Sequence, residues 1–425
     1  MKIKVTDKSY DEVMSIKKQK HKRPRKPNMF FRTLMRVVSI PDLKKTNFKY
    51  ERIGMDKLSK NEPSLVLMNH SSFIDLEIVA TLLYPKPFNI ITTTDAFIGK
   101  DFLLRWIGCI PTKKFVHDSS LVRDIMYAIK NLKSNVVLFP EASYSFDGTA
   151  TPIPDTVAKL IKLLRVPVIM ITTKGAFARD PLYNNIQVRK VDVSAKEEYL
   201  LSPDDIERMS VEEILKCIEA KFNFDNFKWQ QVNMVKISEP TRADYLNRVL
   251  YKCPHCNKEG KMLGKGIKIS CTECGKEYIL NEYGYLEAVD GDSAFNHIPD
   301  WYNWERRCVR EELLCGKYKL ETPVEIMMTV DTKKLYRVGV GVLKHDAEGL
   351  HLTGCDGKLV YEHKPLNSYS IYSDFNWYEI GDVICIGNND ALYYCFPKCE
   401  GDVVAKARLA AEELYKIEIN KKREN

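Results

Sequence analysis

The sequence lacks any long apolar run. No stretch of 18 or more consecutive apolar residues occurs in its 425 residues, although 44% of them are hydrophobic. A membrane-crossing helix needs about 20 such residues, so we expect no transmembrane span. The first residues also carry too much charge for a secretory signal peptide. We therefore expect a cytoplasmic chain long enough for two or three folded domains.

The cysteine pattern gives little indication of disulfide bonding. Of the 12 cysteines, Cys253, Cys256, Cys271 and Cys274 form two C-x2-C pairs, and the others are scattered through the chain. Four thiolates at this spacing are typical of a tetrahedral Zn²⁺ site with no open position for catalysis. We predict a small four-cysteine zinc ribbon at residues 250–290 that holds a structural zinc ion. Disulfides or an iron centre are the alternatives.

Positive charge is concentrated at the N-terminus. Residues 1–60 contain 18 Lys and Arg against 6 Asp and Glu, a net charge of +12, so the remaining residues together carry −4. A basic cluster at 17–26 precedes a segment whose apolar residues recur at helical spacing: Phe30, Phe31, Leu34, Met35, Val37 and Val38. A basic amphipathic segment is typical of a membrane-surface element. We predict that residues 1–60 attach the protein to the inner face of the membrane; a nucleic-acid tail or a helix packed on the core are the alternatives.

Short apolar runs alternate with helical patterns over the predicted domain at 61–245. The predicted strands are 65–68, 88–92, 136–139 and 167–172, and the predicted helices are 119–132 and 155–164. This alternation favours an α/β fold with a mostly parallel sheet. Polar residues after the carboxyl ends of such strands share one crevice. His70 and Glu141, which follow two different strands, are therefore expected to lie close together.

The segment LVLMNHSSFID at 65–75 contains a candidate catalytic pair. We expect Ser71 or Ser72 to cap a helix that begins near Phe73, so that His70 lies on the turn and Asp75 in the first helical turn. A carboxylate that holds one imidazole nitrogen raises the basicity of the other, as a general base requires.

Two alternatives weaken this interpretation when the segment is considered alone. A second pair of the same spacing, His351 and Asp356, occurs in the chain, so the spacing alone is not specific. A neighbouring serine, Ser71 or Ser72, is a rival as a covalent nucleophile, although adjacent side chains on a turn seldom reach the required geometry.

Four segments together carry a family resemblance. NHSSFID, GCIPTKKF at 108–115, FPEASYS at 139–145 and RVPVIMI at 165–171 have the order and approximate spacing of the motif blocks of the glycerolipid acyltransferases. Residues 60–240 resemble this PlsC-type family of 1-acylglycerol-3-phosphate and lysophospholipid acyltransferases. The resemblance implies transfer of a fatty acyl group, in phospholipid biosynthesis, from acyl-CoA or acyl-carrier protein to a lysophospholipid hydroxyl.

The same resemblance assigns roles to residues. It implies that His70 is the general base and Asp75 its partner. It also implies that Lys113 or Lys114 contacts the acceptor phosphate and that Glu141, with Ser143 in the same block, organises the acceptor. The third block usually reads FPEGTRS, and here tyrosine replaces its arginine. Tyrosine cannot replace a bidentate phosphate ligand, so the acceptor head group stays open.

The C-terminal region, 300–425, has short β-rich runs and one final helical pattern at 402–419. This arrangement resembles the pleckstrin-homology-like domains, which bind lipid head groups or protein segments. Two other functions are consistent with the sequence. A lapsed acyltransferase fold could serve as a non-catalytic lipid-surface adaptor, and a zinc ribbon could bind nucleic acid. The ribbon lacks an extended basic stripe, so we do not expect a nucleic-acid partner.

Overall fold

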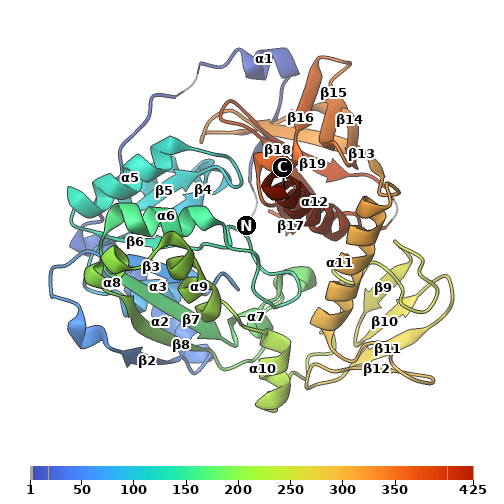
Figure 1. Ribbon diagram of the computed structural model, residues 1–425, viewed down its shortest axis with the longest axis horizontal. Helices are drawn as coiled ribbons and strands as arrows, with labels where there is room; N and C mark the ends of the chain where they lie inside the picture. The colour runs from blue at the N-terminus through green and yellow to red at the C-terminus, as the bar shows by residue number, and fades with distance from the viewer. Residues whose placement is uncertain (1–2, 18, 400, 425) are drawn as a thin grey trace.

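The computed structural model describes residues 3–17, 19–399 and 401–424. Lys18 of the basic cluster lies outside these ranges, as do residues 1–2 of the predicted N-terminal region and residues 400 and 425 of the predicted C-terminal region. Over the described residues the strands form three sheets, of seven, four and eight strands (Figure 1). None of the helices in these ranges is long and apolar enough to cross a membrane.

The seven-stranded sheet belongs to the N-terminal half. Its order is β2 (Lys49–Ile53), β8 (Ser194–Leu201), β7 (Val168–Lys174), β3 (Leu65–Met68), β6 (Asn135–Leu138), β4 (Phe88–Thr93) and β5 (Cys109–Thr112). All neighbouring strands are parallel except β7 and β8. The predicted α/β fold and mostly parallel sheet therefore agree with the strand pairing. The four predicted strands are confirmed to within two residues, whereas the sequence pattern does not predict β2, β5 and β8.

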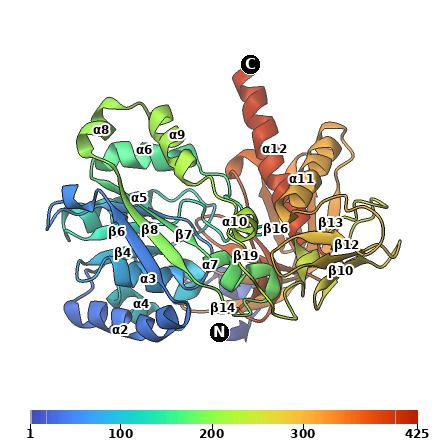
Figure 2. The same cartoon turned by 90° about the horizontal axis from the view of Figure 1, so that it is seen from below.

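Helices cover both faces of this sheet (Figure 2). One layer is α2 (Met29–Lys45), α3 (Asp75–Leu82) and α4 (Asp101–Trp106), and the other is α5 (Ser119–Lys130), α6 (Asp155–Leu164), α8 (Pro203–Arg208) and α9 (Val211–Lys221). Alternate residues of a strand point to opposite faces. In β3, Val66 and Met68 accordingly pack with the first layer, and Leu65 and Leu67 pack with the second. Burial on both faces explains why β3 is a continuous apolar run.

The cysteine-rich segment folds into a separate antiparallel sheet. Helices α7 (Ala176–Arg179) and α10 (Asn226–Val232) precede it, and its strands are β12 (Leu286–Ala288), β11 (Glu277–Leu280), β10 (Lys268–Cys271) and β9 (Met262–Lys265). Helix α11 (Ile298–Leu314) follows. Trp301 of α11 is fully buried against Tyr278 of β11, and its Nε1 donates to the Lys252 carbonyl at 3.0 Å. The helix is therefore anchored to the cysteine-rich sheet.

The C-terminal sheet is antiparallel along its main path. Its order is β16 (Leu359–His363), β15 (Gly349–Gly354), β14 (Leu335–Asp346), β13 (Leu320–Thr329), β19 (Leu392–Pro397), β18 (Gly381–Gly387) and β17 (Tyr372–Trp377). The final helix, α12 (Val404–Glu424), packs against α11 and against β17 and β18. The predicted β-rich region with a final helix is thus confirmed.

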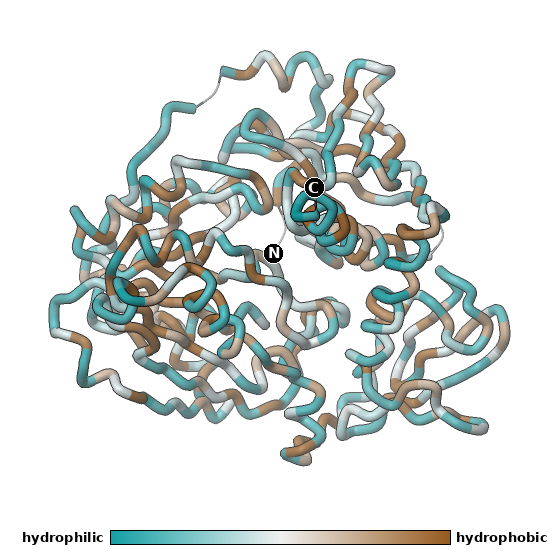
Figure 3. The backbone as a smooth tube through the Cα atoms, viewed as in Figure 1, coloured by the Kyte–Doolittle hydropathy of each residue, from teal (hydrophilic) through white to brown (hydrophobic). Residues whose placement is uncertain are grey.

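The N-terminal segment joins the two halves. Strand β1 (Val5–Asp7) pairs in parallel with β14, and helix α1 (Tyr10–Met14) buries Val13 in the core cluster of the C-terminal half. The chain then crosses to α2 through a hydrophilic stretch at 19–26, while hydrophobic residues concentrate in the strands of the sheets (Figure 3). The predicted membrane-associating region therefore begins on the C-terminal sheet.

Candidate active site

The turn after β3 brings the predicted catalytic pair together. His70 Nδ1 lies 3.1 Å from Asp75 Oδ2, and both side chains are largely buried, with 17% and 2% exposed. Asn69 fixes the end of the strand, because its Oδ1 accepts the backbone N–H of Thr173 on β7 at 2.8 Å. With Nδ1–H donated to the carboxylate, Nε2 becomes the nitrogen that can accept a proton. The arrangement meets the geometric requirement for a general base.

The capping prediction for this turn is wrong in its details. Helix α3 begins at Asp75, two residues later than expected, with Ile74 at the N-cap position and no side-chain cap. The Ser72 hydroxyl accepts the backbone N–H of Ile74 at 3.3 Å, just before the helix. Asp75 Oδ2 instead accepts the backbone N–H groups of Ser71 and Ser72, at 2.9 and 3.1 Å. The Ser72 hydroxyl bonds to the buried carboxylate of Asp180. The carboxylate of the pair thus organises the turn that carries the histidine.

Glu141 supports the backbone of the same turn. It follows β6, is 1% exposed, and its Oε2 accepts the His70 backbone N–H at 3.0 Å. Its Oε1 accepts the N–H and the hydroxyl of Thr151 at 2.9 and 3.2 Å. The expected proximity of His70 and Glu141 is therefore present. Thr151 is a residue that the sequence interpretation missed, because it lies ten residues beyond Glu141 and outside any motif block.

Burial controls the protonation of these groups. It holds the pKa of His70 well below its usual value, and the positive charge of Lys114 adds to this effect. Burial raises the pKa of Asp75 to about 7, although hydrogen bonds from the backbone N–H groups of Ser72 and Ser71 lower it. Burial also raises the pKa of Glu141 to about 7, although hydrogen bonds from Thr151 and His70 lower it. The imidazole is therefore neutral at neutral pH, as a proton acceptor must be.

Two aromatic rings enclose the His70 imidazole. The Phe139 ring centroid lies 4.2 Å from that of His70, and Tyr144 stacks on the other side at 4.0 Å with an interplanar angle of 26°. Phe73, whose side chain is largely exposed, contacts Tyr144 at 5.6 Å. Ser143 is buried, and its hydroxyl donates to the Tyr144 carbonyl at 3.5 Å. The tyrosine that departs from the family motif thus covers the candidate base.

The two second-block lysines face the C-terminal half. Lys113 Nζ donates to the Asn389 carbonyl, and Lys114 Nζ lies 4.3 Å from the ring centroid of Tyr372 on β17. Burial lowers the pKa of Lys114, whereas the carboxylates of Asp374 and Asp95 raise it. Both lysines therefore contact groups that no local motif predicts.

The four cysteines predicted as metal ligands converge. Their sulfur atoms all lie within 4.8 Å of one another, and two pairs, Cys253 with Cys274 and Cys256 with Cys271, are 3.7 Å apart. This distance exceeds the roughly 2.05 Å of a disulfide bond. It matches the edge of a tetrahedron, about 3.8 Å, that four thiolates form around zinc at about 2.3 Å. The cluster therefore fits a four-coordinate metal ion.

The second pair of the same spacing does not assemble. His351 Nε2 lies 3.7 Å from Asp346, whereas Asp356 lies in the turn between β15 and β16. His351 is partly exposed on β15 of the C-terminal sheet, whereas His70 follows β3 of the seven-stranded sheet.

Comparison with known proteins gives a family match for the N-terminal half. Residues 49–174 match the family model Acyltransferase. No curated protein matches the chain. Among solved structures, the chain is similar to the 1-acyl-sn-glycerophosphate (LPA) acyltransferase PlsC from Thermotoga maritima. That similarity has 16% identity and a TM-score of 0.38, and covers 45% of this chain and 76% of that one.

The matched segment contains all four motif blocks in full and every strand of the seven-stranded sheet except β8. The match therefore supports an acyltransferase-type domain over residues 49–174.

Proposed function

We propose that the protein transfers a fatty acyl group from a thioester, acyl-CoA or acyl-carrier protein, to the free hydroxyl of a lysophospholipid such as 1-acylglycerol-3-phosphate. The observation that carries this proposal is the neutral, carboxylate-bonded imidazole of His70 within the acyltransferase domain. A thioester is already activated, so the enzyme mainly aligns and deprotonates the hydroxyl.

In this mechanism His70 Nε2 takes the proton of the acceptor hydroxyl as its oxygen attacks the thioester carbonyl carbon. Asp75 holds Nδ1–H and stabilises the imidazolium that forms. When the tetrahedral intermediate collapses, the carbon–sulfur bond breaks and the imidazolium returns the proton to the departing thiolate. The products are an ester and a free thiol. Glu141 keeps the His70 backbone in place through Oε2.

We further propose that the protein binds the membrane through the apolar face of α2, α3 and α4. Exposed apolar side chains gather on these three helices, which lie on one side of the sheet (Figure 2): Met29, Phe30, Leu34, Val37, Val38, Leu76, Phe102 and Leu103. Phe31 of α2 and Phe102 of α4 both contact Trp106, which joins the helices into one surface. Arg32 and Arg36 on α2 suit anionic head groups.

Phe73 connects this surface to the base. It is 60% exposed and touches Tyr144, which stacks on His70. A lysophospholipid in the outer part of a bilayer could thus reach the base without leaving the lipid. The Cys₄ cluster is proposed to hold a structural zinc ion with no role in the reaction.

The test is replacement of His70 by alanine. Removing a general base lowers turnover by about 10² to 10⁴-fold, so His70→Ala should reduce acyl transfer by at least about 10²-fold with folding and zinc content intact. His351→Ala is the matched control and should leave the rate unchanged. The assay uses acyl-CoA and acyl-carrier protein with a panel of lysolipids. Absence of transfer by the unaltered protein to every acceptor would reject the proposal.

One observation favours a second candidate, a non-catalytic lipid-surface adaptor. The His70 ring is enclosed by Phe139 and Tyr144, and Lys114 lies against the C-terminal half. In an adaptor these contacts would be permanent. The adaptor predicts vesicle binding with no acyl transfer to any acceptor, so the same assay separates the two functions.

A further inference from the structure

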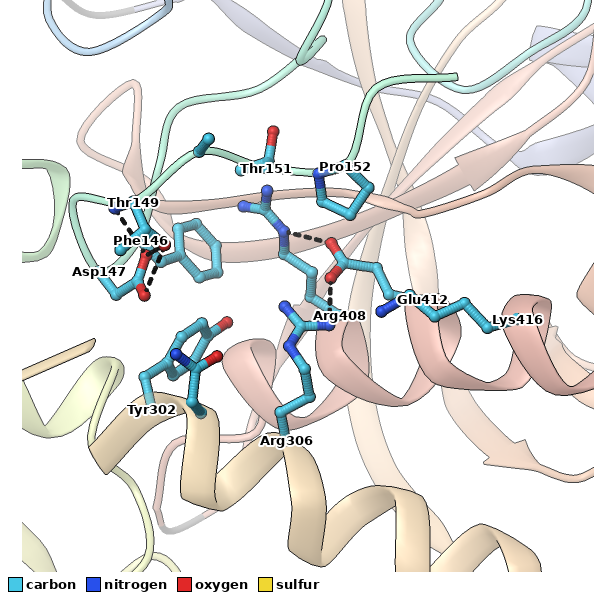
Figure 4. A pocket seen from close by; sticks show the side chains of 12 residues that line it. Phe146, Asp147, Thr149, Thr151, Pro152, Tyr302, Arg306, Arg408, Glu412 and Lys416 are labelled. Carbon is cyan, nitrogen blue, oxygen red and sulfur yellow. Dashed lines mark hydrogen bonds and ion pairs between the residues drawn. The ribbon is translucent and has the colours of Figure 1, made fainter. Parts of the chain in front are cut away.

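A cavity of about 390 Å³ lies between the loop after β6 and helices α11 and α12 (Figure 4). Thr149 and Thr151 belong to its loop side, and Arg306, Arg408 and Lys416 to its helix side. The loop is the third motif block and its continuation, whereas the helices come from the C-terminal half. The cavity is therefore formed by parts of the chain far apart in sequence.

Positive charge predominates in the cavity lining. Its three cations, Arg306, Arg408 and Lys416, stand against two carboxylates, Glu412 and Asp147. Glu412 lies between the arginines, 2.7 Å from Arg306 and 3.1 Å from Arg408 (Figure 4). Asp147 accepts hydrogen bonds from the backbone and a hydroxyl of its own loop. Glu412 thus holds both arginines in place, and Glu413, just outside the lining, pairs with Arg306 at 3.2 Å and with Lys416 at 2.6 Å.

Both arginines have donors left for a ligand. A guanidinium has five N–H groups. Among the described residues, Arg306 bonds to glutamates through one terminal nitrogen, and Arg408 uses Nε and one terminal nitrogen. The hydroxyl of Tyr302 and the side chain of Asn303 add neutral donors from α11. Converging guanidinium and neutral donors are the groups that recognise phosphate oxygens.

Arg408 of α12 places an arginine side chain against the third motif block, which lacks the family arginine. Its terminal nitrogen donates to the Tyr144 carbonyl at 3.2 Å, and its guanidinium lies 4.4 Å over the ring centroid of Phe146. Tyr144 occupies the position where the family motif has arginine. A fork-shaped cation from the C-terminal helix therefore lies against the same loop.

The cavity is also joined to the candidate base. Thr151 lines it and donates two hydrogen bonds to Glu141, which accepts the backbone N–H of His70 through its other oxygen. Glu141 is thus hydrogen-bonded both to a residue of the cavity lining and to the backbone of His70. Thr151 and Glu141 therefore connect the cavity lining to the turn that carries the base.

We propose that this cavity binds the phosphomonoester of the acceptor, with Arg306, Arg408 and Lys416 as its cationic ligands. Arg408 supplies the bidentate donor that the third block lacks. The inference rests on the proposed acyl transfer for the identity of the ligand, and it narrows the acceptor to lysolipids with an exposed phosphate. A separate phosphorylated ligand has the same chemistry, and the kinetic experiment below distinguishes the two sources.

Calorimetric titration of the full chain with sn-glycerol 3-phosphate tests the site directly. We expect binding of this probe and none of glycerol. Asn303→Asp replaces a neutral donor of the lining by a negative charge, which repels phosphate. The variant should therefore bind the probe at least about tenfold more weakly. Arg307→Gln makes the same change in net charge on the exposed side of α11 and should leave the affinity within about twofold of the original. Equal weakening in both variants, or no binding by the unaltered protein, overturns the proposal.

Acyl-transfer kinetics then identify the source of the phosphate. If the acceptor supplies it, sn-glycerol 3-phosphate competes with the lysophospholipid. Asn303→Asp and Lys416→Gln then raise KM for 1-acylglycerol-3-phosphate and leave KM for 1-acylglycerol unchanged. Non-competitive inhibition, or equal effects on the two acceptors, overturns the assignment to the acceptor.

The titration needs no turnover, so the two proposals fail separately. A protein that binds the probe but transfers no acyl group loses the proposed function and keeps a phosphate site. A protein that transfers acyl groups but does not bind the probe loses the phosphate site alone.

Discussion

Stacking of Tyr144 on His70 has a consequence for the charge of the base. The family arginine at this position would place a cation beside the imidazolium that forms during proton transfer. An aromatic face attracts a cation instead, by about 0.5 to 2 kcal/mol. Tyr144 lies 4.0 Å from the His70 ring and therefore offsets part of the burial that holds the pKa of His70 well below its usual value.

The carboxylate of the pair sets the pH dependence that we predict. Asp75 must be ionised to hold the imidazole, and its pKa is raised to about 7. As the pH falls through about 7, Asp75 takes up a proton and kcat/KM should decrease. His70 does not contribute in this range, because its pKa lies well below its usual value and the ring stays neutral. The measurement is kcat/KM from pH 5 to 9.

Asp75→Asn is the control for this assignment. The variant should be slower and should lose the decrease near pH 7, because its side chain does not titrate. Glu141 has a pKa of about 7 as well. A decrease that persists near pH 7 in Asp75→Asn would contradict the assignment and point to Glu141.

At the scale of elements, the cysteine-rich sheet depends on its cluster. Its four strands have three or four residues each, too few to bury a core of their own. In small modules of this kind metal binding supplies much of the folding free energy, about 10 to 16 kcal/mol in zinc-finger peptides. Helix α11 rests on this sheet through Trp301 and carries Arg306 into the cavity. Loss of the metal should therefore disturb the cavity wall.

We predict one zinc ion per chain by metal analysis, lost in Cys274→Ser. Removal of a direct ligand should lower the metal affinity by more than the roughly 10- to 100-fold that loss of an outer-shell partner causes. Cys315→Ser replaces another exposed cysteine outside the cluster and should retain the zinc. Equal zinc content in both variants, or none in the unaltered protein, would contradict the prediction.

Over the whole molecule, the N-terminal segment ties both halves together. Strand β1 extends the C-terminal sheet, and α2 covers the first face of the α/β sheet. The C-terminal half in turn packs on the motif loops, for instance through Phe146 and Phe375, whose ring centroids are 4.4 Å apart. In Figure 2 the helices α2, α3 and α4 lie below the α/β sheet and the C-terminal half lies beside it, joined to α4 where Thr332 Oγ1 donates to Asp101 at 2.9 Å. The apolar side chains of these helices are exposed, so the proposed membrane contact does not require the halves to separate.

Replacing Val37 by aspartate should weaken membrane binding. Val37 is 54% exposed on α2, and burying such a side chain is worth about 1.5 to 3 kcal/mol, so we expect at least about a tenfold loss of partitioning. Val360→Asp makes the same change on the C-terminal sheet and should have no effect. Sedimentation with vesicles that contain anionic lipid measures both. Equal loss in the two variants, or binding indifferent to salt, would contradict the prediction.

Local pattern was enough for much of this protein. The apolar run before His70, the spacing of the four cysteines and the alternation of strands with helices depend on neighbouring residues, and the structure has each of them where the sequence predicts. Strands β1, β2, β5 and β8 were not predictable in this way, because their sequences, VTD, KYERI, CIPT and SAKEEYLL, lack the continuous apolar run that marks β3 and β6.

LVLMNHSSFID by itself determined that a histidine and an aspartate would meet on a strand-to-helix turn, since β3 and α3 fix their separation. Tertiary structure alone decided what surrounds them. Arg408 donates to Tyr144 of the third block, which lies 264 residues earlier in the sequence. Lys114 contacts Tyr372 of β17, which is separated from it by a similar length of sequence. Such contacts arise from packing of the C-terminal half on the motif loops, and no local pattern encodes the partner of a side chain that the fold brings from the other end of the chain.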